Sequence, residues 1–121
     1  MSLCLVANWK LNGSKEFNHQ WALEFLRNFN GNNFSILGIA PASLYIDHLK
    51  TILTDYDIEI GSQNIDLEET GARTGEISAS MIKDLGCAFS IIGHSERRML
   101  FHETNQMICQ KLIQADNNSV I

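Results

Sequence analysis

The chain has 121 residues, of which 45% are hydrophobic and 19% are charged, a balance that excludes a disordered or collagen-like polypeptide. Its formal net charge of −5 at pH 7 disfavours nucleic acid and anionic membranes as partners, because both would be repelled. No apolar run approaches membrane-spanning length, and residues 3–7 are too few for the apolar region of a signal peptide. We therefore expect a cytoplasmic protein.

No segment of the sequence divides it into parts. It has one proline, eight scattered glycines and no serine-rich or single-charge stretch that would serve as a linker. We predict a single domain over residues 1–121. Cys4, Cys87 and Cys109 fit neither a paired disulfide framework nor a CxxC metal site, so we expect three core thiols and no metal.

Strand and helix patterns alternate from the beginning of the chain. The apolar run at residues 3–7 predicts a strand, and Asn12-Gly13-Ser14 predicts a turn. Aromatic residues then recur every fourth position, as on one face of a helix, at Phe17, Trp21 and Phe25. Residues 34–40 predict a second strand. A second helical repeat follows at Tyr45, Leu49, Ile52 and Leu53.

The same alternation continues in the second half. Residues 58–62 predict a third strand, residues 77–85 a helix stopped by Gly86, and residues 89–93 a fourth strand. Residues 104–115 predict a further helix. Val120 and Ile121 then mark the start of a fifth strand, so we expect a chain that is truncated relative to the complete fold.

Strands that alternate with helices indicate an α/β fold with parallel strands, since each strand must return to the same end of the sheet. Two folds have this order of elements. A doubly wound sheet usually carries a glycine-rich phosphate loop after its first strand, and residues 8–13 lack the GxGxxG and Walker spacings. An eight-stranded β/α barrel is therefore favoured, with its first four β/α units and the start of the fifth strand present here.

Ligands of parallel α/β folds bind at the carboxyl ends of the strands, so polar residues directly after each apolar run are candidates for chemistry. Such residues follow the first, third and fourth predicted strands: Asn8, Lys10, Gln63, Asn64, His94, Ser95 and Glu96. We expect them to converge in one pocket.

Lys10 offers a cation for a phosphate or for a developing enolate oxygen, and the alternative is an ordinary solvated lysine. The position of Lys10 at a strand end favours the functional cation over the solvated lysine. Asn8 either holds Lys10, donates to a substrate oxygen, or satisfies its own turn.

His94 precedes residues 95–98, which predict a short helix, and a positive helix end disfavours an imidazolium. A neutral histidine there would donate a hydrogen bond to a carbonyl, whereas the alternative is a strand-end histidine satisfied by backbone groups. Glu96 either orients Lys10, transfers protons, or stabilises the helix start.

Residues 71–76 are too many and too polar for a minimal connection, so they form either a protruding functional loop or a mobile one, of a kind that often contacts a partner. We assign a structural role to Arg97 and Arg98, as ion pairs with Glu76, Glu103 or a partner subunit.

Together these segments resemble the triose-phosphate isomerase family. The resemblance spans nearly the whole chain and is carried, in this order, by Asn8-Trp9-Lys10, Gln63-Asn64, residues 71–78 (GARTGEIS) and residues 91–98 (IIGHSERR). Another phosphosugar barrel family would not explain the first and last of them together. Arg73 departs from the aromatic residue usual at its place in the family's loop.

The resemblance implies a (β/α)8 TIM barrel that interconverts dihydroxyacetone phosphate and D-glyceraldehyde 3-phosphate through an enediolate, in glycolysis and gluconeogenesis, with no metal or organic cofactor. It implies that Asn8 and Lys10 contact the substrate, that His94 polarises its carbonyl, and that Glu96 supports Lys10. A histidine kept neutral by a helix start is a described feature of this family. The loop with Thr74, Gly75 and Glu76 would insert beside a second subunit's active site, which implies a homodimer.

The resemblance also implies a glutamate base after the sixth strand, beyond residue 121, with a closing lid and loops that grip the phosphate. Glu68, Glu69 and Glu103 are expected on solvated loops or helix starts, so none of them replaces this base. We expect the 121-residue chain alone to be inactive. The alternative is a noncatalytic half-barrel that self-associates through exposed sheet edges or acts as an interaction module.

Overall fold

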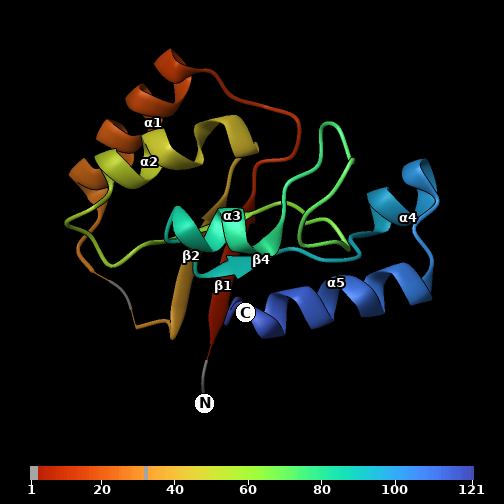
Figure 1. Ribbon diagram of the computed structural model, residues 1–121. Helices are drawn as coiled ribbons and strands as arrows, with labels where there is room; N and C mark the ends of the chain where they lie inside the picture. Colours follow the sequence, from red (N-terminus) through yellow and green to blue (C-terminus); the bar gives the residue numbers. More distant parts are fainter. Residues whose placement is uncertain (1–2, 32) are drawn as a thin grey trace.

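Residues 3–31 and 33–121 are described by a computed structural model, in which strands and helices alternate (Figure 1). The strands are β1 (Cys4–Asn8), β2 (Ile36–Ala40), β3 (Glu59–Ser62) and β4 (Phe89–Ser90). The helices are α1 (Lys15–Asn28), the short 3-10 helix η1 (Ser43–Tyr45), α2 (Ile46–Ile52), α3 (Ala79–Asp84), α4 (Ser95–Phe101) and α5 (Asn105–Asn117). Every strand and helix that the sequence predicted is present, with ends shifted by a few residues.

The strands form one parallel, 4-stranded sheet in the order β1-β2-β3-β4. The last residue extends this sheet beyond β4. The N–H of Ile121 donates to the carbonyl of Ala88 at 3.1 Å, and the N–H of Ser90 donates to the carbonyl of Ile121 at 2.9 Å. The expected start of a fifth strand is therefore present as backbone pairing at Ile121.

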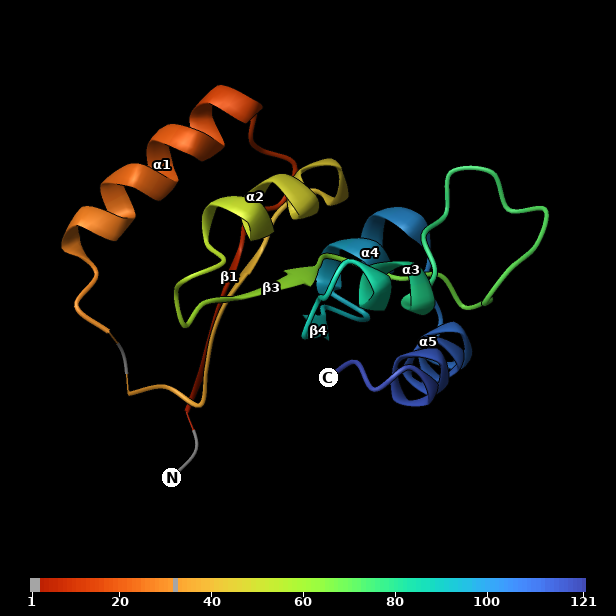
Figure 2. The same cartoon turned by 60° about the vertical axis from the view of Figure 1, so that its left-hand side comes forward.

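The helices are arranged around a curled sheet. Figures 1 and 2 show α1 and α2 side by side at one end of the molecule, whereas α5 lies at the other end, near β4. Parallel strands in chain order, joined by helices, are the first half of a β/α barrel, which confirms the predicted fold class. Within residues 3–31 and 33–121, no helix is both long and apolar enough to cross a bilayer.

The core lies between the sheet and its helices. Ile39 of β2 and Ile60 of β3 are 3% and 1% exposed. They belong to one cluster with Leu49 and Leu53, from the predicted apolar face of α2 and its end, and with Ile82 of α3. Burial of this apolar surface is the main term that holds the helices on the sheet.

An aromatic row covers the start of the first β/α unit. Trp9, directly after β1, contacts Trp21 of α1 edge to face, with ring centroids 4.8 Å apart. Phe25 stacks on Trp21 at 4.9 Å, and Phe29 stacks on Phe25 at 5.2 Å. The four-residue spacing seen in the sequence therefore aligns these rings along one face of α1.

Two predictions, one on a strand and one on the cysteines, need correction. β4 has two residues instead of the five predicted at 89–93, because Gly93, with φ of +68°, turns the chain out of the sheet and into α4. The prediction of three core thiols is wrong for Cys4 and Cys109, which are exposed, while Cys87 is buried. Cys4 is exposed because β1 has a strand on one side only, and burial raises the pKa of the Cys87 thiol to about 11.

On the opposite face of the sheet from Ile39 and Ile60, the ring of Phe89 lies across Gly38 and Gly61. A Cβ at Gly38 would meet this ring at 2.5 Å, and a Cβ at Gly61 would meet it at 2.4 Å. Both separations are far below van der Waals contact, so a residue without a Cβ is needed at these positions to leave space for the Phe89 ring.

We predict that Gly61→Ala destabilises the protein by about 1–3 kcal/mol, because the new methyl group overlaps the Phe89 ring and overpacks the sheet face. The free energy of unfolding, measured in urea, checks this. Adding Phe89→Leu should restore part of the loss, since the smaller side chain makes room for the methyl. A double variant less stable than the sum of the two single variants would contradict this account.

Candidate active site

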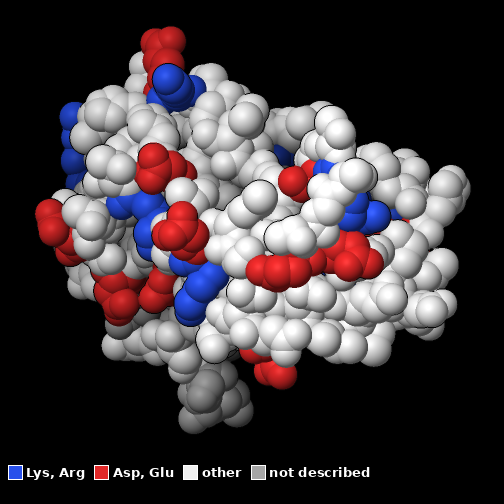
Figure 3. All heavy atoms as spheres, viewed as in Figure 1, with Lys and Arg blue, Asp and Glu red and all other residues white. Residues whose placement is uncertain are grey.

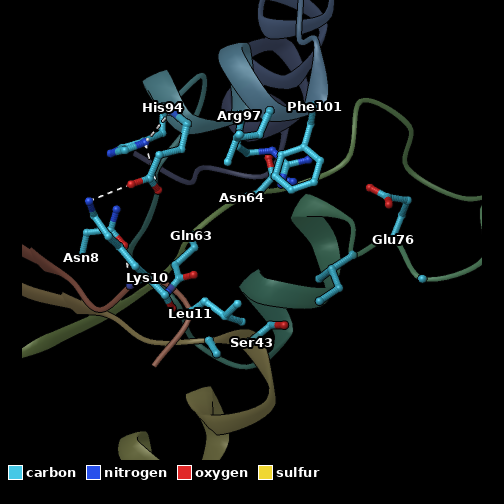
Figure 4. A pocket seen from close by; sticks show the side chains of 15 residues that line it. Asn8, Lys10, Leu11, Ser43, Gln63, Asn64, Glu76, His94, Arg97 and Phe101 are labelled. Carbon is cyan, nitrogen blue, oxygen red and sulfur yellow. Dashed lines mark hydrogen bonds and ion pairs between the residues drawn. The ribbon is translucent and has the colours of Figure 1, made fainter. Parts of the chain in front are cut away.

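A hollow of about 480 Å³ opens at the carboxyl ends of the strands (Figure 4). Its lining comes from the segments after β1, β2, β3 and β4 and from α4: Asn8, Lys10, Leu11, Ala42, Ser43, Gln63, Asn64, Gly75, Glu76, Ile77, His94, Glu96, Arg97, Leu100 and Phe101. Residues distant in sequence meet here because parallel strands all end on the same side of the sheet. Of the seven polar candidates predicted at the strand ends, all but Ser95 line this hollow.

Lys10 has an unusual backbone. Its φ is +55°, in the left-handed region, which costs a non-glycine residue about 1–2 kcal/mol. The side-chain oxygen Oδ1 of Asn8 accepts a hydrogen bond from the Lys10 N–H at 2.9 Å and so stabilises this turn. Asn8 therefore satisfies its own turn and holds Lys10 at the same time.

The Lys10 side chain crosses the hollow to α4. Its Nζ lies 2.7 Å from Oε1 of Glu96, and the two side chains are 53% and 45% exposed. The hydrogen bond from Lys10 lowers the pKa of Glu96, so this carboxylate stays ionised at neutral pH. The pair fixes the direction of a cation that water and ligands can still reach.

His94 caps the first turn of α4. Its Nδ1 accepts a hydrogen bond from the N–H of Glu96 at 3.1 Å. Glu96 Oε2 is 3.6 Å from the same nitrogen, which is beyond hydrogen-bond length, so the backbone contact decides the tautomer. An Nδ1 that accepts carries no proton, and the imidazole is then neutral with its hydrogen on Nε2.

Gln63 and Asn64, directly after β3, connect the hollow to its surroundings. Gln63 Nε2 donates to the carbonyl oxygens of Lys10 and Ala40, at 2.9 Å each. Asn64 Oδ1 accepts from Nζ of Lys111 at 2.8 Å. Both side chains are thus used to join elements as well as to line the hollow.

A buried charged cluster supports α4 and α5. Glu103 accepts from Nζ of Lys111 at 2.8 Å and is also paired with Arg97, and the Glu103 and Lys111 side chains are only 1% and 3% exposed. Burial alone would raise the pKa of Glu103, but the hydrogen bonds from Lys111 and Arg97 outweigh it and leave this pKa lowered. The guanidinium of Arg97 also lies 4.7 Å from the ring centroid of Phe101.

Glu103, which we expected on a solvated loop or a helix start, directly precedes the N-cap of α5 but is buried. The signal that would have revealed its burial is Lys111, which falls in the apolar stripe of α5 between Ile108 and Ala115, all three being buried. A buried lysine needs an acidic partner. The expected pairing of Arg97 with Glu103 is present, while Arg98 instead donates to Asn105 Oδ1 at 2.7 Å.

The loop between β3 and α3 protrudes from the molecule, and Thr74, Gly75 and Glu76 on it are exposed. Gly75 and Glu76 reach the edge of the hollow, and Figure 4 shows Glu76 well apart from Lys10 and His94. Arg73, the departure from the family pattern, makes a two-pronged ion pair with Asp66, whose side chain is 5% exposed. That pair lowers the pKa of Asp66 to about 2.

On the face seen in Figure 3, both basic and acidic side chains are present. In the part of the chain that the structure describes, no group of three or more His, Cys, Asp or Glu residues is placed to hold a metal ion. The polar side chains that line the hollow are those of a lysine, an arginine, a histidine, a serine, amides and carboxylates.

A family model described as Triosephosphate isomerase matches residues 3–121. The chain belongs to the triosephosphate isomerase family. A relative of that name from Baumannia cicadellinicola subsp. Homalodisca coagulata is 44% identical over 119 residues, which cover 97% of this chain and 46% of the relative. One from Blochmanniella floridana is 45% identical over 114 residues, 91% of this chain and 44% of the relative. This member of the triosephosphate isomerase family thus spans about half the length of the curated relatives it matches.

We predict that the Asp66–Arg73 pair stabilises the protein only above acidic pH. The folded-state pKa of Asp66, about 2, lies below its ordinary value of 3.8. The stabilisation is therefore complete above pH 4 and is lost as the pH falls through 2. Arg73→Gln should lower the free energy of unfolding at pH 7, and this difference from the wild type should shrink as the pH falls towards 2 and vanish below it. Urea unfolding of both proteins across this range tests it, and a difference that does not change with pH would contradict it.

We predict that Lys111→Met destabilises the protein by about 2–3 kcal/mol, because it leaves the buried Glu103 carboxylate with Arg97 alone. Lys15→Met, at an exposed position at the start of α1, is the control and should change stability by less than about 0.5 kcal/mol. Thermal unfolding of the two variants measures the difference. Equal effects would mean that the buried cluster does not stabilise the fold.

Proposed function

We propose that the chain provides the lysine and histidine of an isomerase that interconverts dihydroxyacetone phosphate and D-glyceraldehyde 3-phosphate. The observation that carries this proposal is the geometry of the hollow, where the Lys10 ammonium and a neutral His94 come from the ends of β1 and β4 and are linked through Glu96. Membership of the family supports the same reaction.

The reaction moves one proton between adjacent carbon atoms through an enediolate. The hydrogen on Nε2 of His94 donates to the substrate carbonyl oxygen and polarises it. The Lys10 ammonium stabilises the negative charge that develops on oxygen. Asn8, whose Oδ1 is used by the Lys10 N–H, retains amide hydrogens on Nδ2 that donate to a substrate oxygen. Glu96 keeps the lysine pointing into the hollow.

The proton must leave one carbon and return to the other through a base. Glu96 and Glu76 are the carboxylates among the residues that line the hollow. Glu96 is paired with Lys10, and Glu76 lies on the exposed loop apart from His94. We therefore propose that the base is a glutamate outside residues 1–121 and that the 121-residue polypeptide alone does not turn over substrate.

The loop that carries Thr74, Gly75 and Glu76 is proposed to insert beside the active site of a second copy, giving a homodimer. The exposure of this loop supports that role. The Asp66–Arg73 ion pair supports it as well, because a loop that is already ordered loses less conformational entropy on association. The reaction would belong to glycolysis and gluconeogenesis in the cytoplasm, with no cofactor. A noncatalytic half-barrel is not favoured, since the family match runs through every strand and the hollow gathers the candidate residues.

A chimera tests the proposed function. Residues 3–121 replace the matching part of the Baumannia cicadellinicola relative, which then supplies the rest of a barrel. We expect isomerase turnover from the chimera and none from the purified 121-residue polypeptide. Lys10→Met in the chimera should lower kcat/KM by about 10²–10³-fold, because it removes the charge that stabilises the enediolate.

Lys15→Met is the matched control, since Lys15 is exposed at the start of α1 and does not line the hollow. It should leave kcat/KM within about twofold. A folded but inactive chimera, or turnover that is indifferent to Lys10, would refute the proposal.

A further inference from the structure

The side chain of Gln63 joins the ends of three neighbouring strands. Gln63 follows β3 directly, and its Nε2 donates one hydrogen to the carbonyl of Lys10, after β1, and the other to the carbonyl of Ala40, at the end of β2. Both bonds are 2.9 Å long. Figure 4 shows the Gln63 side chain beside Lys10 inside the hollow. A primary amide has two hydrogens on one nitrogen, and here both are used.

The backbone of Lys10 is consequently held from both sides. Asn8 Oδ1 accepts from its N–H, and Gln63 Nε2 donates to its carbonyl. A left-handed φ at a residue with a side chain, as at Lys10, persists only where several surrounding contacts stabilise it. Asn8 is two residues away and moves with the same turn, whereas Gln63 is 53 residues away and ties that turn to β2 and β3.

The position of the Lys10 ammonium depends on this backbone. The Lys10 side chain is 53% exposed, so packing does not fix its path, and the direction of its Cα–Cβ bond decides which way Nζ starts. A φ in the ordinary negative region would aim the side chain elsewhere and break the 2.7 Å contact with Glu96. The turn must therefore be kept for the cation to reach the hollow.

We propose that Gln63 is a positioning residue of the active site: by binding the Lys10 carbonyl it keeps the left-handed turn that directs the Lys10 ammonium into the hollow. The residue type fits this role. Glutamate has no hydrogen to donate, asparagine is one methylene shorter, and a cation would stand close to Lys10. This inference rests on the proposed isomerase function, because the position of the Lys10 ammonium matters for catalysis only if the protein has that function.

The first test uses the 121-residue chain and needs no activity. A residue with positive φ has its amide hydrogen close to its Hα, so Lys10 should show a strong intraresidue NOE between these two hydrogens. The resonances of Glu96 should shift when Lys10 is substituted. Gln63→Met keeps the size of the side chain and removes both donors. We expect it to weaken this NOE at Lys10 and to move the Lys10 carbonyl 13C resonance.

Gln110→Met is the matched control, because Gln110 is exposed in the middle of α5. It should leave both Lys10 signals unchanged. Gln63→Asn keeps an amide and serves if the methionine variant does not fold. If a folded Gln63 variant retains the wild-type NOE and carbonyl shift at Lys10, the positioning role is overturned, whatever the activity of the chimera.

The second test is kinetic and uses the chimera. Gln63→Met should lower kcat/KM by about 10–100-fold, mostly through kcat, because a misplaced ammonium mainly loses its stabilisation of the transition state. With Met already at position 10, the same change should cost less than about twofold, since no ammonium is left to position. Equal losses in the two backgrounds would mean a merely structural amide and would overturn the proposal. An inactive wild-type chimera would instead refute the proposed function and leave the NMR result standing.

Discussion

Parallel pairing of the strands in chain order is the constraint on which the candidate site depends. Each strand enters the sheet from the same side, so each leaves its last residue at the same edge. Asn8, Gln63 and His94 line the same hollow for this reason, although 86 positions separate the first from the last. The hydrogen bonds of the hollow then act on residues that the sheet has already brought together.

The hollow is shaped by a second layer of polar contacts behind it. Lys111 and Glu103 are buried and hold Asn64 and Arg97, two lining residues on different elements. Buried charges are costly unless every partner is in place, so such a cluster tolerates few alternative arrangements. The lining of the hollow thereby gains rigidity from groups that do not reach it.

The sequence predicted the elements well because their signals are local. Apolar runs and four-residue repeats located the strands and helices, and the rule that ligands bind at strand ends selected Asn8, Lys10, His94 and Glu96 as candidates. The roles of these residues rest on the family resemblance. Their convergence in one hollow follows from topology, which a periodic pattern can indicate.

Other features could not be predicted because they depend on distant partners. Gln63 looked like any polar residue after a strand, and its two bonds depend on the register of β1, β2 and β3. The Asp66–Arg73 pair, in a similar way, requires the loop to fold back on its own base. Glu103 was misassigned because exposure was inferred from residue type, while burial was decided by the position of Lys111 on α5.

The aromatic row on α1 gives the protein an optical property. The chain contains two tryptophans, Trp9 and Trp21, and their rings are in contact. All of its indole fluorescence therefore originates at one place, where β1 passes into the first turn. Trp9 directly precedes Lys10 in the chain, so the environment of its indole depends on the backbone conformation of Lys10. The emission spectrum of the unlabelled protein is thus an internal reporter on the left-handed turn at Lys10 in its candidate active site.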